Sequence, residues 1–381
     1  MGLSRQASRR PGWPDDPPML RTALIGFPST GKTALFQLMT SAHGAPRAAH
    51  GRTDVTLGVA RVPDPRLDVL TAMYRPRKRV PAMVEFADIP GRPSGSGAGA
   101  LLDVAAYRNA DALVHVVRAF EDPAVPHAAG SIDPLRDARA MEDELILADL
   151  AVAEKRLDRL AKDLKKARTA ELEGEQAVLA ACRAHLERGT ALRDLELPDD
   201  DRRRLRGFQF LSAKPLLLVL NADERDLARG LDRLPERYGL AGPGTGPRTR
   251  AVAVCAKIEL EVAQLDEADA AAFLADLGLK ASGLDRVIRA SYDLLGYVSF
   301  FTVGEDECRA WSVPRGTPAQ AAAGEIHTDL SRGFIRAEVV AFDRLAGRGS
   351  MAACRDHGEV RLEGKDYPVA DGDVITVRFA T

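Results

Sequence analysis

The 381-residue sequence has four cysteines and no long apolar run. The cysteines, at positions 182, 255, 308 and 354, show none of the paired spacings of zinc sites or redox dithiols, so we expect reduced thiols. No apolar run approaches the ~20 residues that span a bilayer, and the first residues lack the apolar stretch of a secretory signal. We therefore expect a cytoplasmic protein without a membrane partner.

The sequence also lacks an excess of either charge, since 53 basic residues are balanced by 55 acidic ones. A net charge of −2 gives no general attraction to nucleic acid, and we expect no DNA partner. Any RNA contact would need a local basic patch. The composition, 45% hydrophobic and 28% charged, is typical of a soluble globular protein, and the length indicates two or three domains.

Six short apolar runs, separated by helical patterns, predict an α/β domain with a mostly parallel sheet covered on both faces. The runs are residues 23–26, 59–62, 84–87, 113–117, 216–220 and 251–255. Between about 134 and 206 the runs give way to heptad-like leucine spacing, which predicts an antiparallel helical hairpin inserted in the sheet domain. After a helix near 284–295, turn signals and short strands predict a small mixed α/β domain with one helix over 318–327.

These patterns divide the chain into five predicted segments. They are a disordered tail over residues 1–19, the α/β domain over 20–139 and 208–281, a helical coiled-coil insertion over 140–207, a connecting helix over 282–295 and a C-terminal domain over 296–381. The tail is predicted because its arginines and prolines show almost no apolar periodicity.

Residues 26–33, GFPSTGKT, match the eight-residue phosphate loop (P-loop), between an apolar strand and a helix. In such a loop backbone N–H groups and the helix N-terminus surround the phosphates, Lys32 reaches the outer phosphates, and Thr33 ligates Mg²⁺. A glycine turn leading into an ordinary helix is the alternative. The expected phosphate-binding residues are Gly26, Phe27, Pro28, Ser29, Thr30, Gly31, Lys32, Thr33 and Ala34.

A second motif, residues 88–91 with the sequence Asp-Ile-Pro-Gly, follows the buried strand predicted over 84–87. There Asp88 would assist Mg²⁺ either by contacting one of the metal's ligands or through a bridging water. The Gly91 N–H could reach the terminal phosphate. Thr53 is the best candidate for a switch threonine that completes the Mg²⁺ shell, with Thr56 as a competitor. A plain turn is the alternative for the Asp-x-x-Gly pattern.

The third motif, residues 221–224, occupies the place where guanine-selective proteins have Asn-Lys-x-Asp. Ala222 replaces the lysine and Glu224 replaces the aspartate, and the longer carboxylate cannot take the same bidentate position. We therefore predict that Asn221, Ala222 and Glu224 line a base pocket with little guanine selectivity, although an ordinary strand-to-helix turn is possible. Cys255 and Ala256, at the end of the last apolar run, complete the expected nucleotide-binding set.

Hydrolysis is harder to assign, because the glutamine that orients water in Ras-like enzymes is absent and Arg92 follows Gly91. Arg92 could stabilise transition-state charge or point to solvent. His127, in the loop over 120–131, could reach the phosphate edge or be merely solvated. These two residues are the catalytic candidates.

A basic stripe is predicted on one face of the first insertion helix, at spacings of i, i+4, i+7 and i+11. It consists of Lys155, Arg159, Lys162 and Lys166, with a basic cluster at 202–204 near its base. Such a stripe is either a solvated helix face or a contact for the RNA backbone.

The order of the three motifs, the helical insertion and the C-terminal sequence resemble those of the YchF-type Obg-like ATPases, a branch of the Obg family of translation-factor GTPases. The resemblance covers residues 20–381. Its most specific stretches are 62–67, 133–136, 144–150, 324–329, 333–338 and 363–367. This chain differs from the family at three places. They are Ser29 and Thr30 in the P-loop, the segment 50–52 before the switch threonine, and the stretch 91–109, which is shorter in this chain.

The resemblance implies a Ras-like P-loop domain (OBG-type) interrupted by a coiled coil and followed by a ubiquitin-like (β-grasp) TGS domain. It also implies a slow Mg²⁺-dependent ATPase that prefers ATP to GTP and binds the ribosome, at the large subunit and with ribosomal RNA contact. A GTPase or dual-specificity enzyme is one alternative. A ribosome or RNA adapter that holds ATP as a structural ligand is the other.

Overall fold

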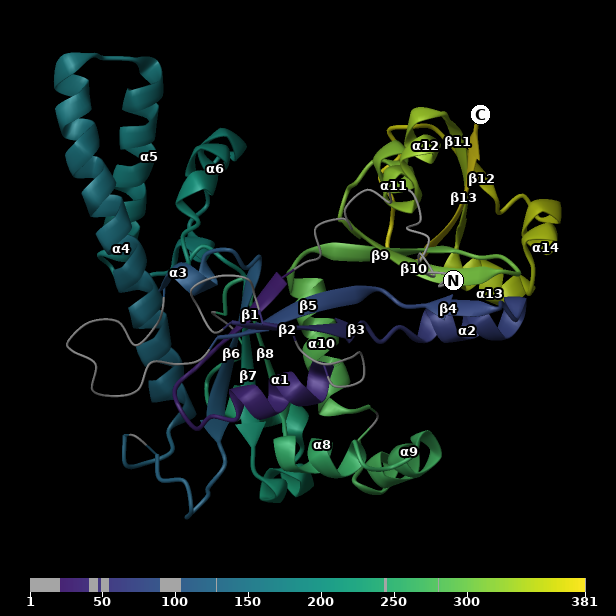
Figure 1. Cartoon of the computed structure of the whole chain (residues 1–381), viewed down its shortest axis with the longest axis horizontal. Helices are drawn as coiled ribbons and strands as arrows, with labels where there is room; N and C mark the ends of the chain where they lie inside the picture. The colour runs from purple at the N-terminus through teal and green to yellow at the C-terminus, as the bar shows by residue number, and fades with distance from the viewer. Residues whose placement is uncertain are drawn as a thin grey trace, which may run out of the picture.

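The computed structural model describes residues 21–40, 47–48, 55–89, 104–127, 129–242, 245–279 and 281–380. Two β-sheets organise these residues, and a helical hairpin and the C-terminal domain stand on opposite flanks of the first sheet (Figure 1). The tail predicted over 1–19 lies outside the described residues. Among the described helices, none is long and apolar enough to cross a membrane.

The first sheet has seven strands in the order β2-β3-β5-β1-β6-β7-β8. Their bounds are β1 Arg21–Ile25, β2 Arg47–Ala48, β3 Thr56–Arg61, β5 Met83–Asp88, β6 Ala112–Ala119, β7 Leu216–Ala222 and β8 Thr249–Val254. The pairs from β5 to β8 are parallel, and β3 is antiparallel to both of its neighbours. β6 and β7 are buried along their whole length, as expected for parallel strands with both faces covered. The predicted mostly parallel sheet is thus confirmed.

Helices cover both faces of this sheet and form two apolar cores. One core packs Phe36 of α1 and Val287 of α10 against the sheet, and the other packs Met141 and Ile258 from the opposite face. The helices and 3₁₀ turns here are α1 Lys32–Thr40, α2 Pro65–Tyr74, α3 Val104–Tyr107, η4 Glu224–Arg229, η5 Leu231–Arg233, α7 Leu234–Arg237, α8 Ala256–Val262, α9 Glu267–Asp276 and α10 Gly283–Leu294.

The insertion is an antiparallel pair of helices, α4 (Pro134–Lys166) and α5 (Ala170–Leu186), as the leucine spacing predicts. Asp133 caps α4 by accepting the Arg136 N–H, and Thr169 caps α5. The first turns of α4 pack on the sheet, whereas Leu160 and Leu179 belong to a separate apolar core of the hairpin. The base of the hairpin is formed by η2 Leu192–Asp194, α6 Asp199–Leu205 and η3 Arg206–Phe208.

The C-terminal domain is built on a six-stranded sheet in the order β12-β11-β13-β9-β10-β4. Its bounds are β4 Lys78–Val80, β9 Tyr297–Thr302, β10 Glu307–Pro314, β11 Phe334–Ala341, β12 Arg361–Glu363, β13 Asp373–Phe379, α11 Ala319–Ile326, α12 Thr328–Arg332, α13 Phe342–Arg348 and α14 Met351–Asp356. β4 comes from the N-terminal part of the chain and pairs in parallel with β10. The helix predicted over 318–327 is confirmed by α11, and the extended backbone of His327 separates it from α12, which follows the predicted range.

Candidate nucleotide-binding site

The P-loop connects the end of β1 to the start of α1 at the carboxyl edge of the first sheet. Gly26 and Gly31 have φ angles of +147° and +92°, which L side chains rarely adopt. A Cβ at Gly26 would lie 2.5 Å from the Val116 carbonyl oxygen, and one at Gly31 would meet the Asn221 amide nitrogen. Glycine is therefore required at both positions, where the backbone passes close to neighbouring strands.

Lys32 crosses beneath the loop. Its Nζ donates to the Gly26 and Phe27 carbonyl oxygens, at 2.6 and 2.9 Å, and the residue is buried. Burial lowers the pKa of Lys32, and the negative charge of Asp88 opposes that shift. An ammonium group has three N–H donors, so one remains for a phosphate oxygen.

Asp88 ends β5 beside the P-loop and has features of a metal partner. The residue is 8% exposed, and its Oδ1 has no hydrogen-bond partner within the described part of the chain. Thr33, in the first turn of α1, is exposed. Within the described ranges no group of three or more His, Cys, Asp or Glu side chains could hold a metal alone. A hydroxyl, a carboxylate and phosphate oxygens together match the oxygen ligands that Mg²⁺ prefers.

Asn221, at the end of β7, ties the P-loop to the next strand-to-helix turn. Its Nδ2 donates to the Thr30 carbonyl at 3.1 Å, and its Oδ1 accepts the Ala256 N–H at 3.1 Å. Cys255 and Ala256 are both buried at this turn, and burial raises the pKa of the Cys255 thiol. The structure therefore brings the first and third predicted motifs together through one amide side chain.

Glu224 follows β7 at the expected base-reading position and forms an ion pair with Lys257 of α8, with Oε2 and Nζ 2.6 Å apart. Ala222 is buried in the sheet core. Asp223 instead accepts hydrogen bonds from the backbone and side chain of Arg225, and the side-chain bond lowers the pKa of Asp223 to about 2. Lys257 was missed in the sequence, because no motif links it to Glu224.

His127 lies in the loop between β6 and α4, at the same edge of the sheet as the P-loop. Its Nδ1 accepts the Ala129 N–H at 3.1 Å, so Nε2 carries the proton of the neutral ring. Nε2 is 2.9 Å from Asp137 Oδ2, close enough for an ion pair if the ring is protonated but outside hydrogen-bond geometry. The other predicted residues Thr53, Gly91 and Arg92 lie outside the described residues.

Sequence reasoning also passed over His115, which is buried in β6 opposite Ile25 of β1. Burial, followed by the charge of Lys32, lowers the pKa of His115 to about 3. Its Nε2 has no hydrogen-bond partner among the residues described. The available signal was its place as the one polar residue in the apolar run over 113–117.

Together these features define a class: an α/β P-loop domain with a helical insertion, followed by a β-rich C-terminal domain. Residues 297–380 match the family model YchF-GTPase_C, whose description is "Protein of unknown function (DUF933)". That match coincides with the second sheet and its helices, apart from β4.

Relatives match nearly the whole chain. Ribosome-binding ATPase YchF of Bacillus subtilis (strain 168) is 40% identical over 367 residues, which cover 94% of this chain and 99% of that protein. Obg-like ATPase 1 of Oryza sativa subsp. japonica is 34% identical, covering 98% of this chain and 97% of that protein. The structure of the Schizosaccharomyces pombe YchF GTPase matches with a TM-score of 0.81 at 29% identity, covering 96% of this chain and 99% of that chain. This chain belongs to the YchF and Obg-like ATPase family, which confirms the resemblance seen in its motifs.

Proposed function

We propose that this chain hydrolyses ATP slowly with Mg²⁺ and binds the ribosome. The observation that carries the ATP-binding part is the P-loop itself, with Lys32 held beneath two glycines that no other residue could replace without strain. The name of the Bacillus subtilis relative, a ribosome-binding ATPase, agrees with both parts of the proposal. The loop would bind the phosphates through its backbone N–H groups and the N-terminus of α1.

Thr33, Thr53 and Asp88 would hold Mg²⁺ between them and the phosphates. The metal, when bound, neutralises charge on the β- and γ-phosphate oxygens. Asp88 supports this role because its Oδ1 is buried beside Lys32 without a partner among the described residues. Gly91 would offer its N–H to the terminal phosphate in the same arrangement.

Slow turnover follows from the residues available to activate water. No glutamine follows Gly91, where Ras-like enzymes have one, and Arg92 stands there instead. His127 is the remaining candidate base, but its Nδ1 already accepts the Ala129 N–H. The ring proton would have to move from Nε2 to Nδ1, with loss of the Ala129 hydrogen bond, or the ring would have to turn, before His127 could activate water.

A preference for ATP over GTP follows from the Glu224–Lys257 ion pair. Guanine presents two adjacent donors, and a carboxylate captures both only when it is correctly placed and not neutralised by a neighbouring cation. Lys257 Nζ competes for the same carboxylate at 2.6 Å. The adenine amine would be received by backbone carbonyls, because Asn221 Oδ1 already accepts the Ala256 N–H.

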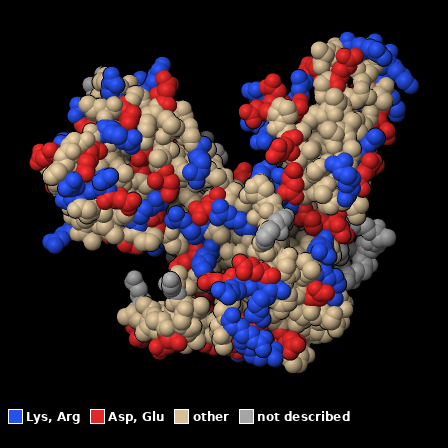
Figure 2. Space-filling model, turned by 180° about the vertical axis from the view of Figure 1, so that it is seen from behind, with Lys and Arg blue, Asp and Glu red and all other residues tan. Residues whose placement is uncertain are grey.

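The hairpin is the proposed contact with ribosomal RNA, on the large subunit. Lys155, Arg159, Lys162 and Lys166 are all exposed along α4. Figure 2 shows Lys and Arg side chains gathered over the distal end of the hairpin, and a second group of them low on the sheet domain in that view. A long arm that ends in positive charge is suited to reach RNA phosphates.

Competition of ATP and GTP against a fluorescent ATP analogue tests the proposed nucleotide. The expected result is that ATP displaces the analogue at lower concentration than GTP does. If GTP competes tenfold better than ATP, the base pocket has been misassigned and the chain is a GTPase.

A further inference from the structure

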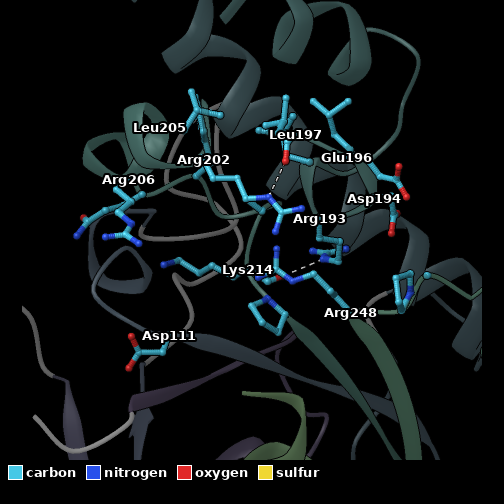
Figure 3. Close-up of a pocket in the computed structure, with 18 residues that line it drawn as sticks. Asp111, Arg193, Asp194, Glu196, Leu197, Arg202, Leu205, Arg206, Lys214 and Arg248 are labelled. Carbon is cyan, nitrogen blue, oxygen red and sulfur yellow. Dashed lines mark hydrogen bonds between the residues drawn. The ribbon is translucent and has the colours of Figure 1, made fainter. Parts of the chain in front are cut away.

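A large cavity lies at the opposite edge of the first sheet from the P-loop. Its lining includes residues directly before three parallel strands, namely Asp111 before β6, Pro215 before β7 and Arg248 before β8. The P-loop follows the other end of β1, which runs parallel to these strands. The cavity has a volume of about 1000 Å³ and is bounded by η2 and α6 at the base of the hairpin (Figure 3).

Arg193 lines this cavity and is 5% exposed. Its Nε donates to the Lys214 carbonyl at 2.9 Å, and its Nη1 pairs with Glu142 at 2.6 Å. Its Nη2 is buried without a hydrogen-bond partner among the described residues. A buried charged donor without an acceptor is unfavourable, and a ligand oxygen would supply the acceptor once the Arg193 side chain turns toward the cavity.

Two further arginines, Arg202 and Arg248, lie near Arg193. The three side chains gather in the middle of the view in Figure 3, and Asp111 lies apart from them. Arg202 Nε donates to the Leu197 carbonyl, and the Arg248 guanidinium has no hydrogen bond or ion pair within the described residues. Arg248 is exposed overall, but desolvation within the cavity and then the charges of Arg193 and Arg202 lower the pKa of Arg248, while Asp194 opposes the shift.

We propose that this arginine pocket, defined by Arg193, Arg202 and Arg248, binds a phosphate ester that carries an apolar or planar group. Three neighbouring guanidinium groups repel one another, and a doubly charged phosphate offsets that repulsion better than a single carboxylate does. The apolar part of the ligand would lie on the remaining lining, which includes Leu205 and Phe210. The site is separate from the nucleotide site and does not depend on it.

Calorimetric titration of the full chain with phenyl phosphate tests the proposal. The nucleotide site is first saturated with Mg²⁺ and a non-hydrolysable ATP analogue, and benzyl alcohol serves as the uncharged control. We expect phenyl phosphate to bind at one site and benzyl alcohol not to bind. Lys32→Ala should leave this affinity unchanged, which separates the arginine pocket from the P-loop.

Arg248→Gln is the informative variant, because Arg248 makes no side-chain hydrogen bond within the described residues that the substitution would remove. It should weaken phenyl phosphate binding at least tenfold, whereas Arg250→Gln, an exposed arginine of β8 outside the cavity, should not. Absence of binding to the unmodified chain, or equal binding by both variants, would overturn the proposal.

Displacement of bound phenyl phosphate then identifies the source of the ester. Displacement by uridine monophosphate supports a free nucleotide-like ester, and displacement by a short RNA alone supports phosphate groups of RNA. If neither displaces it, the assignment to phosphate esters of this size is wrong.

Discussion

At the proposed base-reading position, we expect a single side chain, Glu224, to decide between a preference for ATP and a preference for GTP. Glu224→Asp shortens the carboxylate that pairs with Lys257 and brings it toward the position that captures guanine donors. We expect the preference for ATP to decrease by about tenfold, because each donor left unpaired costs about 1–3 kcal/mol. Competition binding with ATP and GTP measures the change.

The control for this variant is Glu236→Asp, at an exposed glutamate of α7. It should leave both affinities unchanged. The double variant Ala222→Lys with Glu224→Asp should move selectivity further toward GTP, although Ala222 is buried and the lysine must first be accommodated. An unaltered ratio of ATP to GTP affinity in Glu224→Asp would show that this carboxylate does not face the base.

His115 makes stability depend on pH. Its pKa is lowered to about 3 in the folded chain by burial and by Lys32, against an ordinary value of 6.5. As the pH falls below about 6.5 the unfolded chain gains a proton that the folded chain does not, so stability is lost at up to about 1.4 kcal/mol per pH unit. This loss continues toward pH 3.

His115→Leu should remove that dependence, since leucine has no proton to gain. Urea unfolding of both proteins at pH 7, 6 and 5 is the measurement, and the free energy of unfolding should fall less steeply for the variant. Parallel pH profiles for the two proteins would contradict the assignment of a neutral, buried imidazole.

For individual residues, the sequence predicts those site residues that belong to a local motif. The P-loop, Asp88 and Asn221 follow from motif order, and the structure places them at one edge of the first sheet. The Glu224–Lys257 pair joins residues 33 positions apart along the chain, and the restraint on His127 comes from Asp137 and Ala129. Such contacts depend on how loops pack, which residue types and spacing do not determine.

Among the elements, α4 carries the basic stripe and gives a prediction about ribosome binding. Arg159→Glu with Lys162→Glu should weaken co-sedimentation with ribosomes, because neutralised phosphates release counterions. The dependence of affinity on salt should also become shallower, with the log–log slope reduced by about 1 for each phosphate that the variant no longer neutralises.

The matched control is Arg229→Glu with Arg233→Glu, two exposed arginines near β8 and away from the hairpin. It changes the net charge by the same amount. If both variants co-sediment equally, general charge explains the binding and the stripe is only a solvated face.

Elements with a pattern in their own sequence were predictable, and elements that form only through distant pairing were not. The hairpin follows from leucine spacing sustained along α4 and α5. β4 has three residues and gains its strand structure from pairing with β10, more than 200 positions later, so its own sequence contains little signal. The break between α11 and α12 arises at His327, whose side chain caps α12.

Across the whole molecule, a common apolar cluster and an ion pair connect the two sheets. Phe86 of β5 and Val374 of β13 belong to the same apolar cluster. Arg66 of α2 donates to Asp371 at 2.8 and 3.2 Å, and Asp371 also accepts the Ser299 N–H at 2.9 Å. We therefore expect the α/β domain and the C-terminal domain to unfold together.

Asp371→Ala removes these bonds and should lower the free energy of unfolding by about 1–2 kcal/mol. The effect is no larger because solvent screens the partly exposed pair. Asp366→Ala, at an exposed position, is the control. Differential scanning calorimetry should show one transition for the unmodified chain. Two separate transitions, or equal stability of both variants, would contradict a coupled pair of domains.

The central claim, that this chain is an ATPase, is tested most directly by single-turnover hydrolysis of ATP with purified, nucleotide-stripped protein and Mg²⁺. We predict slow but complete conversion of bound ATP to ADP. Lys32→Ala removes a charge partner of the phosphates and should abolish this conversion. Circular dichroism should show that the variant is folded. Bound ATP that stays intact in the unmodified protein would contradict the account and favour an adapter that holds ATP as a structural ligand.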